Sequence, residues 1–208
     1  MLKDLSIVEF ANETASNSPA PGGGSIAALN AAMAASLLSM VANLTIGKKK
    51  YMDFSQRAEK IAEECSQYKD LFVNAIDKDA SSFNGVMAAM KLPKDTEEEK
   101  EIRSAKIQEE YKNAIEVPLS LGTKVTELYS YCKELAQNGN SNAITDVAVA
   151  LINIRAASEG AFLNVKINLN SLKDEKYKHE LEEKMESVNK LVEENEREIK
   201  KVVDEKLA

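Results

Sequence analysis

A glycine-rich turn, Pro21-Gly22-Gly23-Gly24-Ser25, is the first group of residues whose types and spacing could do chemistry. Three consecutive glycines lose much chain entropy on ordering, so we expect a backbone conformation or approach that a Cβ would prevent. Because an apolar helical segment follows, the turn would present free N–H groups and the positive end of a helix dipole, a natural site for an anion. The alternative is a tight helix-entry turn capped by Ser25. The turn matches neither a Walker A loop nor a dinucleotide-binding fingerprint.

Asp79 is the carboxylate best placed for acid–base chemistry. Apolar residues recur around it at helical spacing, so it lies in the middle of an apolar stripe formed by Phe72, Ile76, Phe83 and Val86. A carboxylate in such a place needs a partner or a task, because burying it unpaired is costly. Asp77 faces another side of the same helix, so the two acids do not form an obvious dyad. The alternative is a buried Asp79 that pairs with a lysine or a backbone group.

A line of polar residues follows one face of a segment further along the chain. It comprises Asp146, Asn153, Asn164 and Asn168, interleaved with Ala150, Ala157, Gly160 and Ala161. Small residues would let a ligand approach the backbone, and the polar groups would hydrogen-bond to it. The alternative is a close helix–helix contact with a buried polar network.

A basic cluster, Lys48-Lys49-Lys50, stands beside Tyr51. In an acidic protein such a cluster is where an anionic ligand would be captured. The alternative is a solvated helix end.

Other common catalytic groups are missing from this sequence. The single histidine, His179, lies in a highly charged stretch, which excludes Ser-His-Asp and Cys-His catalysis and any histidine metal site. Cys65 and Cys132 lie far apart without a CxxC pair, so we expect reduced core thiols, no disulfide and no zinc. The sequence thus predicts no metal site, and any catalysis would use carboxylates, amides, lysines and backbone dipoles.

The elements that position these residues are predicted to be helices in a single domain spanning residues 1–208. The chain has 8 Gly and 4 Pro, where average usage would give roughly 15 and 10. So few turn-formers argue against sandwiches, barrels and doubly wound sheets and favour an all-α, up-and-down bundle. We expect helices over Ser6–Thr14, over Ser25–Ile46 with Gly47 as its stop, over Asp53–Lys91, from Thr96 to Asn138 with a kink or division at Pro118, over Ser141–Asn170, and from Asp174 nearly to the end.

Charge and hydropathy limit the setting of the protein. Its 27 basic and 34 acidic residues give a net charge of −7, the wrong sign for a general nucleic-acid binder. Asp4 and Glu9 interrupt what a signal peptide would need, so we expect a cytoplasmic protein. No charge occurs between Glu13 and Lys48, but this segment is rich in alanine and contains polar residues. It therefore favours a helix buried on all sides over a membrane span.

The last helix carries a narrow apolar seam between charged faces. Its members are Leu181, Met185, Val188, Val192, Asn195, Ile199 and Val202. Such a seam needs a partner helix, either within the bundle or across a dimer.

Taken together, these motifs resemble the cyclodeaminase/cyclohydrolase family of folate one-carbon enzymes over nearly the whole chain. The resemblance rests on blocks in a fixed order: Ser18–Ser25, Leu44–Tyr51, Asp77–Phe83 leading to Lys91–Lys94, Ala114–Pro118, Asn140–Asp146 and Asn164–Leu169. It implies an all-helical homodimer that binds folate in a cleft, with Asp79 as the catalytic group and no cofactor besides the folate substrate.

The resemblance implies one of two activities. We favour hydrolysis of 5,10-methenyltetrahydrofolate to 10-formyltetrahydrofolate, because the chain has no room for a fused formiminotransferase domain; the alternative is closure of 5-formiminotetrahydrofolate with loss of ammonia. Asp79 would act as general base. Asp146, Asn164 and Asn168 would orient the pterin, and the glycine turn with Lys48 and Lys49 would hold the glutamate tail. A non-catalytic helical scaffold or folate-binding protein is the alternative of another class.

Overall fold

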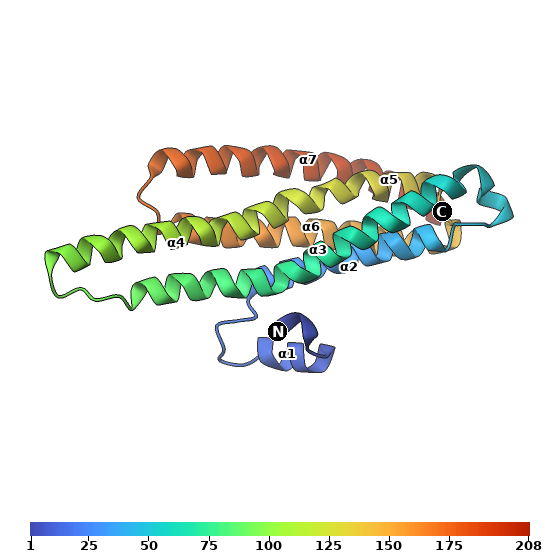
Figure 1. Cartoon of the computed structure of the whole chain (residues 1–208). Helices are drawn as coiled ribbons and strands as arrows, with labels where there is room; N and C mark the ends of the chain where they lie inside the picture. Colours follow the sequence, from blue (N-terminus) through green and yellow to red (C-terminus); the bar gives the residue numbers. More distant parts are fainter.

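The protein is a bundle of long helices without a strand. The computed structural model describes residues 1–208, and its α-helices are α1 (Ile7–Thr14), α2 (Gly23–Asn43), α3 (Met52–Met90), α4 (Glu97–Lys124), α5 (Leu128–Asn138), α6 (Ile144–Leu169) and α7 (Glu175–Leu207). Short 3-10 turns lie at Leu2–Asp4, Lys49–Tyr51, Val125–Glu127 and Ser141–Ala143. The long helices lie side by side, and α1 stands apart from them (Figure 1). The all-α prediction is confirmed.

Side-chain caps begin several helices where the sequence predicts them. The Ser6 side chain accepts the Glu9 N–H while Glu9 accepts the Ser6 N–H, and Thr96 and Glu99 form the same reciprocal pair. Asp174 accepts the Tyr177 N–H at the start of α7. Each cap satisfies N–H groups that have no partner within the first helical turn.

Two predicted helix boundaries are wrong. Helix α2 ends at Asn43, and the chain reaches Gly47, with φ +70°, only after a further turn. Pro118 lies inside a continuous α4, and the helix is interrupted at Val125–Glu127 instead. Pro118 cannot donate to the carbonyl of Ala114 four residues earlier. The Asn168 side chain on α6 donates to that carbonyl at 3.3 Å, which supplies the missing partner.

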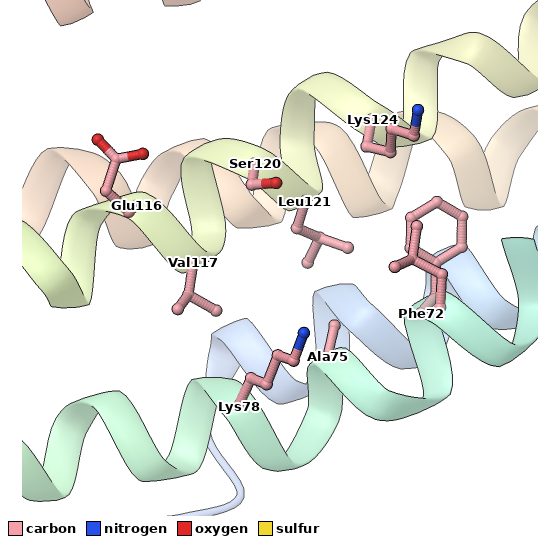
Figure 2. A pocket seen from close by; sticks show the side chains of 9 residues that line it. Phe72, Ala75, Lys78, Glu116, Val117, Ser120, Leu121 and Lys124 are labelled. Carbon is pink, nitrogen blue, oxygen red and sulfur yellow. The ribbon is translucent and has the colours of Figure 1, made fainter.

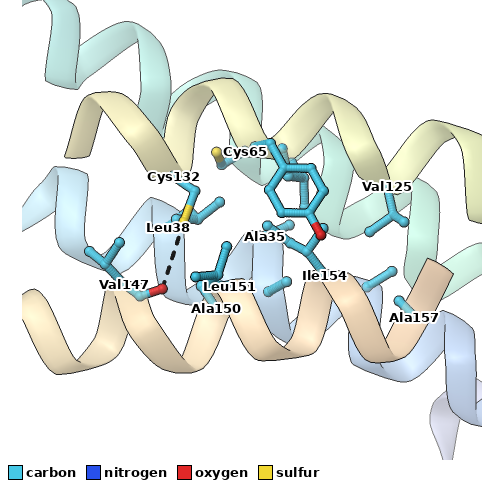
Figure 3. Close-up of a cluster of buried hydrophobic side chains, with 14 of the residues drawn as sticks. Ala35, Leu38, Cys65, Val125, Cys132, Val147, Ala150, Leu151, Ile154 and Ala157 are labelled. Carbon is cyan, nitrogen blue, oxygen red and sulfur yellow. Dashed lines mark hydrogen bonds between the residues drawn. The ribbon is translucent and has the colours of Figure 1, made fainter. Parts of the chain in front are cut away.

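Helix α2 is the centre of the core and packs mainly against α3 and α6. Its inward faces are built of alanines, with Ala28, Ala31 and Ala35 fully buried, so neighbouring backbones approach closely. Figure 3 shows the part of the core where Cys65 and Cys132 lie; both thiols are free and buried, and the Cys132 thiol donates to the Val147 carbonyl at 3.7 Å. Burial raises the pKa of Cys65 to about 12. Both cysteines therefore lie in the core, as the sequence predicts.

One side of α2 is nevertheless exposed. By length and composition α2 is the one helix that could cross a membrane, and 56% of its most apolar window is buried within the bundle. Met33 and Met40 are exposed at 44% and 38%. The prediction of a helix buried on all sides is therefore wrong for this strip.

The seam on α7 finds its partners within the bundle. Leu181 and Met185 pack against residues of α4 and α6, and Val192, Ile199 and Val203 join the main core. Helix α7 contacts α6 and α5. The interpretation as ordinary bundle packing is confirmed.

Candidate active site

A cavity of about 610 Å³ lies between the start of α2, the second half of α3, and parts of α4 and α6. Four of the sequence motifs meet there: the glycine turn, the segment around Asp79, the segment around Ala114 on α4, and the end of α6 with Asn164 and Asn168. These segments lie far apart in the sequence, and the antiparallel course of the helices brings them together.

Asp79 projects from α3 toward the first turn of α2. The Ser25 hydroxyl lies 3.0 Å from Asp79 Oδ2. No side chain caps α2, whose N-cap residue is Gly22, so the carboxylate lies where free N–H groups and the positive helix end favour it. Burial raises the pKa of Asp79, while the hydroxyl and N–H of Ser25 oppose that shift. The carboxylate is thus desolvated and held by few groups.

Gly24 allows this close approach. A Cβ on Gly24 would lie 2.7 Å from Asp79 Oδ2 and 2.5 Å from its Cγ, closer than real contacts permit. A Cβ on Gly23 would lie 3.2 Å from Asn164 Nδ2, a much milder conflict. The glycine turn is therefore required chiefly because the catalytic candidate occupies the space beside Gly24.

Not every residue of the predicted turn lines the cavity. Gly22, Gly23 and Gly24 do, whereas Pro21 and Ser25 are buried beside it. The alternative prediction that Ser25 caps the helix is wrong, because Ser25 lies within the first turn and points toward α3.

The side-chain amides of Asn164 and Asn168 on α6 line the cavity, and each makes one hydrogen bond within the protein. Asn164 donates to the Gly160 carbonyl at 2.8 Å, and Asn168 donates to the Ala114 carbonyl. Neither amide oxygen accepts a hydrogen bond within the protein, so both remain available to a donor in the cavity.

Lys48, Lys49 and Asp146 lie away from this cavity within a single chain. Helix α2 has 21 residues and a rise of about 1.5 Å per residue, so its two ends are about 30 Å apart. The lysines follow the far end of α2, and Asp146 lies in the first turn of α6 at that same end. Their predicted roles at the folate are not supported by the position of these side chains in one chain.

The far end of α2 has a polar cluster of its own. Asn140 donates from its backbone to Thr45 at 3.0 Å and from its side chain to the Leu44 carbonyl at 3.0 Å. The Ser141 N–H donates to the Tyr51 phenol oxygen at 3.0 Å, and the Ser141 hydroxyl and N–H lower the pKa of Tyr51 to about 8. These contacts tie the end of α2 to the start of α6.

An apolar wall of the cavity, which the sequence did not predict, lies opposite the glycine turn. Phe83, Met87, Met90 and Tyr111 line it, from α3 and α4. Phe83 is 41% exposed, so it turns from the expected core stripe into the cavity. The helical spacing of Phe83, Met87 and Met90 was the signal available in the sequence.

A second hollow of about 300 Å³ lies one turn further along the same two helices (Figure 2). Lys78 from α3 and Lys124 from α4 line it, over apolar side chains that include Phe72 and Leu121. Lys124 pairs with Glu127 at 2.9 Å, whereas Lys78 makes no ion pair within the chain. Glu116 also lines this hollow; its carboxylate is directed away from Lys78 in Figure 2 and accepts the Tyr177 hydroxyl at 2.8 Å.

Other charged groups do not complete a metal site or a second acid pair. No three His, Cys, Asp or Glu side chains are grouped so that they could hold a metal ion. Asp77 faces away from the cavity and accepts the Leu2 N–H at 2.7 Å, as its predicted position on another face requires. His179 is exposed and lies 3.4 Å from Glu183 on α7.

Comparison with known proteins gives a consistent result. The profile of the formiminotransferase-cyclodeaminase family matches residues 6–187. A methenyltetrahydrofolate cyclohydrolase of Methylorubrum extorquens is 39% identical over 180 residues, which cover 86% of each chain. A formimidoyltransferase-cyclodeaminase of Gallus gallus is also 39% identical, over 82% of this chain but 32% of that one, so the chain spans about a third of that relative. A solved structure of formiminotetrahydrofolate cyclodeaminase from Thermotoga maritima superimposes over 100% of both chains, with a TM-score of 0.89 and 29% identity.

Proposed function

Because the chain belongs to the formiminotransferase-cyclodeaminase family, we propose that its cavity hydrolyses 5,10-methenyltetrahydrofolate to 10-formyltetrahydrofolate. The observation that carries this proposal is Asp79, a desolvated carboxylate held against the first turn of α2 in a cavity of about 610 Å³. The Methylorubrum extorquens relative, which aligns with this chain over 86% of its own length, is named a methenyltetrahydrofolate cyclohydrolase. This name favours the same activity.

The chemistry of the substrate suits a lone carboxylate. The methenyl bridge is a cationic amidinium carbon and is already electrophilic, so water can attack it directly. As the C–O bond forms, Asp79 accepts one proton from the water. When the bond from carbon to the ring nitrogen breaks, Asp79 returns that proton to the nitrogen and the new hydroxyl loses its own proton to solvent. The cationic bridge and water thus give a neutral formyl group and one released proton.

The cavity residues have roles that follow from their positions. An ionised Asp79 attracts the cationic bridge because both lie in a desolvated site. The amide oxygens of Asn164 and Asn168 accept N–H groups from the pterin. The wall of Phe83 and Met87 covers the flat ring and excludes bulk water.

We propose that the hollow with Lys78 holds the anionic glutamate tail. This hollow lies between α3 and α4, the same two helices that line part of the cavity. Lys78 makes no ion pair within the chain. Lys78→Gln should raise KM severalfold and leave kcat unchanged, since a rim charge contributes to binding alone. Lys69→Gln is the matched control, because Lys69 on the same helix pairs with Asp70 at 3.0 Å. A KM that rises equally in both variants would refute this placement.

Cyclodeamination is the second candidate, favoured by the full-length structural match to a formiminotetrahydrofolate cyclodeaminase. Assaying the purified protein with methenyl- and formimino-tetrahydrofolate side by side distinguishes the two. We expect faster turnover of the methenyl compound. Ammonia release as the faster reaction would reverse the order, and turnover of neither would favour a folate-binding protein or scaffold. Folate at about 100 times its dissociation constant should stabilise the protein by about 2.7 kcal/mol.

We also propose that the protein is a cytoplasmic homodimer formed through α2 and α6. The exposed strip of α2, with Met33 and Met40, carries no charge, and the neighbouring helix α6 exposes Ile152, Leu163 and Ile167 at 62%, 65% and 65%. Exposed apolar side chains gathered on neighbouring helices are typical of a subunit interface. Light scattering should give twice the chain mass, and Leu163→Glu should give a monomer. A wild-type monomer at micromolar concentration would refute the dimer.

A further inference from the structure

Ser25 is completely buried and lies between two acceptors. Its hydroxyl is 3.0 Å from Asp79 Oδ2 and 3.2 Å from the backbone carbonyl of Ile76, both on α3. A serine hydroxyl has one proton to donate and two lone pairs with which to accept. It can therefore donate to only one of these two oxygens at a time.

The Ile76 carbonyl can only accept, so the protonation state of Asp79 decides the direction of both bonds. When Asp79 is ionised, the hydroxyl of Ser25 donates to Oδ2 and stabilises the negative charge. When Asp79 is protonated on Oδ2, the carboxyl donates to Ser25, and Ser25 turns its own proton to the Ile76 carbonyl. Both states are then hydrogen-bonded without movement of the carboxyl group.

We propose that Ser25 is a positioning residue that reverses its hydrogen bond each time Asp79 gains or loses a proton. This inference rests on the proposed function for its catalytic consequence, because the reaction takes Asp79 through both states in every turnover. Ser25 was predicted to bind the substrate; it instead contacts the Asp79 carboxylate and does not line the cavity. The Ser25 hydroxyl contacts Oδ2, and no side chain within the protein donates a hydrogen bond to Oδ1.

The surroundings leave few other groups that could perform this task. From α2, α4 and α6, the cavity lining contributes no charged side chain, and Tyr111 on α4 is its other titratable group. On α3 itself, Asp77 and Lys78 directly precede Asp79, but Asp77 accepts the Leu2 N–H and Lys78 lines the second hollow. Burial raises the pKa of Asp79, and the hydroxyl and the N–H of Ser25 both lower it, so loss of the hydroxyl leaves only the N–H to oppose burial.

Ser25→Ala tests this role by two measurements. In the free protein, the side-chain carboxyl carbon of Asp79, identified by its absence in Asp79→Asn, should titrate about one to two pH units higher in Ser25→Ala. In the enzyme, the acid limb of the plot of kcat/KM against pH should shift to higher pH by the same amount. At the optimal pH, kcat should fall about tenfold or more, while KM should change less than twofold.

Ser36→Ala is the matched control, because Ser36 on the same helix donates to the Ala32 carbonyl at 2.7 Å, away from the cavity. It should leave both titrations unchanged. If Ser25→Ala lowers only the melting temperature and the Asp79 titration does not move, the proposal is refuted. If the titration moves but wild-type protein turns over no folate, the coupling between Ser25 and Asp79 stands and the proposed function fails.

Discussion

Gly24→Ala is the substitution whose effect the structure specifies most closely. The added Cβ would lie 2.5 Å from Asp79 Cγ, whereas ordinary contact begins near 3.4 Å, so the carboxyl group has to retreat by about 1 Å. A misplacement of about 1 Å near reacting atoms costs roughly 10²-fold in rate. We therefore expect kcat to fall about 100-fold or more.

The same change should affect stability far less. Alanine in place of glycine in a helix contributes up to about 1 kcal/mol, while overpacking costs about 1–3 kcal/mol. The net loss of about 2 kcal/mol or less corresponds to a melting temperature lower by about 8 °C at most for a chain of this size.

Gly23→Ala is the control, since its Cβ would meet only the Asn164 amide at 3.2 Å. Turnover of methenyltetrahydrofolate, followed spectrophotometrically, should stay within about tenfold of wild type. Full activity in Gly24→Ala, or equal losses in both variants, would show that the space beside Gly24 does not determine the position of Asp79.

Three further predictions concern the same region. Asp79→Asn should lower kcat by about 10²–10⁴-fold in the same assay, and Asp77→Asn should have little effect, because only Asp79 faces the cavity. Since burial raises the folded pKa of Asp79 above its unfolded value, the unfolded state binds fewer protons between those values and stability falls as pH rises through them. Asp79→Asn should therefore melt at a higher temperature than wild type at pH 7, and this difference should shrink below about pH 4; a lower melting temperature at pH 7 would contradict it. Asn168→Ala should cost about 1–3 kcal/mol in chemical denaturation by leaving the Ala114 carbonyl unpaired, and Pro118→Ala should reduce that cost by restoring an N–H; equal costs in both backgrounds would show that Asn168 does not compensate for the proline.

Local sequence signals predicted most of the helices because their physical causes are local. Ser6 and Thr96 each stand three residues before a glutamate, and both form the expected capping boxes. The predicted division of the helix at Pro118 was wrong, because the effect of this proline depends on a distant group. The proline leaves the Ala114 carbonyl without a backbone donor, and the Asn168 side chain donates to it instead. No local sequence pattern predicts that contact.

The candidate site was predictable only in part for a similar reason. Asp79 and the glycine turn could be singled out from residue type and spacing. The order of motifs along the chain did not show which ends of antiparallel helices meet, so Lys48 and Asp146 were grouped with residues about 30 Å away. The distance follows from the 21 residues of α2, a length that the sequence did contain.

The alanine-rich α2 also determines where this site can vary during evolution. A larger side chain at Ala28 or Ala31 would push α3 or α6 away and displace the glycine turn with it. The wall that α3 contributes to the cavity is different, because Met87 and Met90 are exposed at 40% and 39%. Methionine side chains are flexible, so other residues can replace them at these positions with little strain. Selection for a different one-carbon substituent should therefore act first on the α3 wall, and the half of the site contributed by α2 should diverge most slowly.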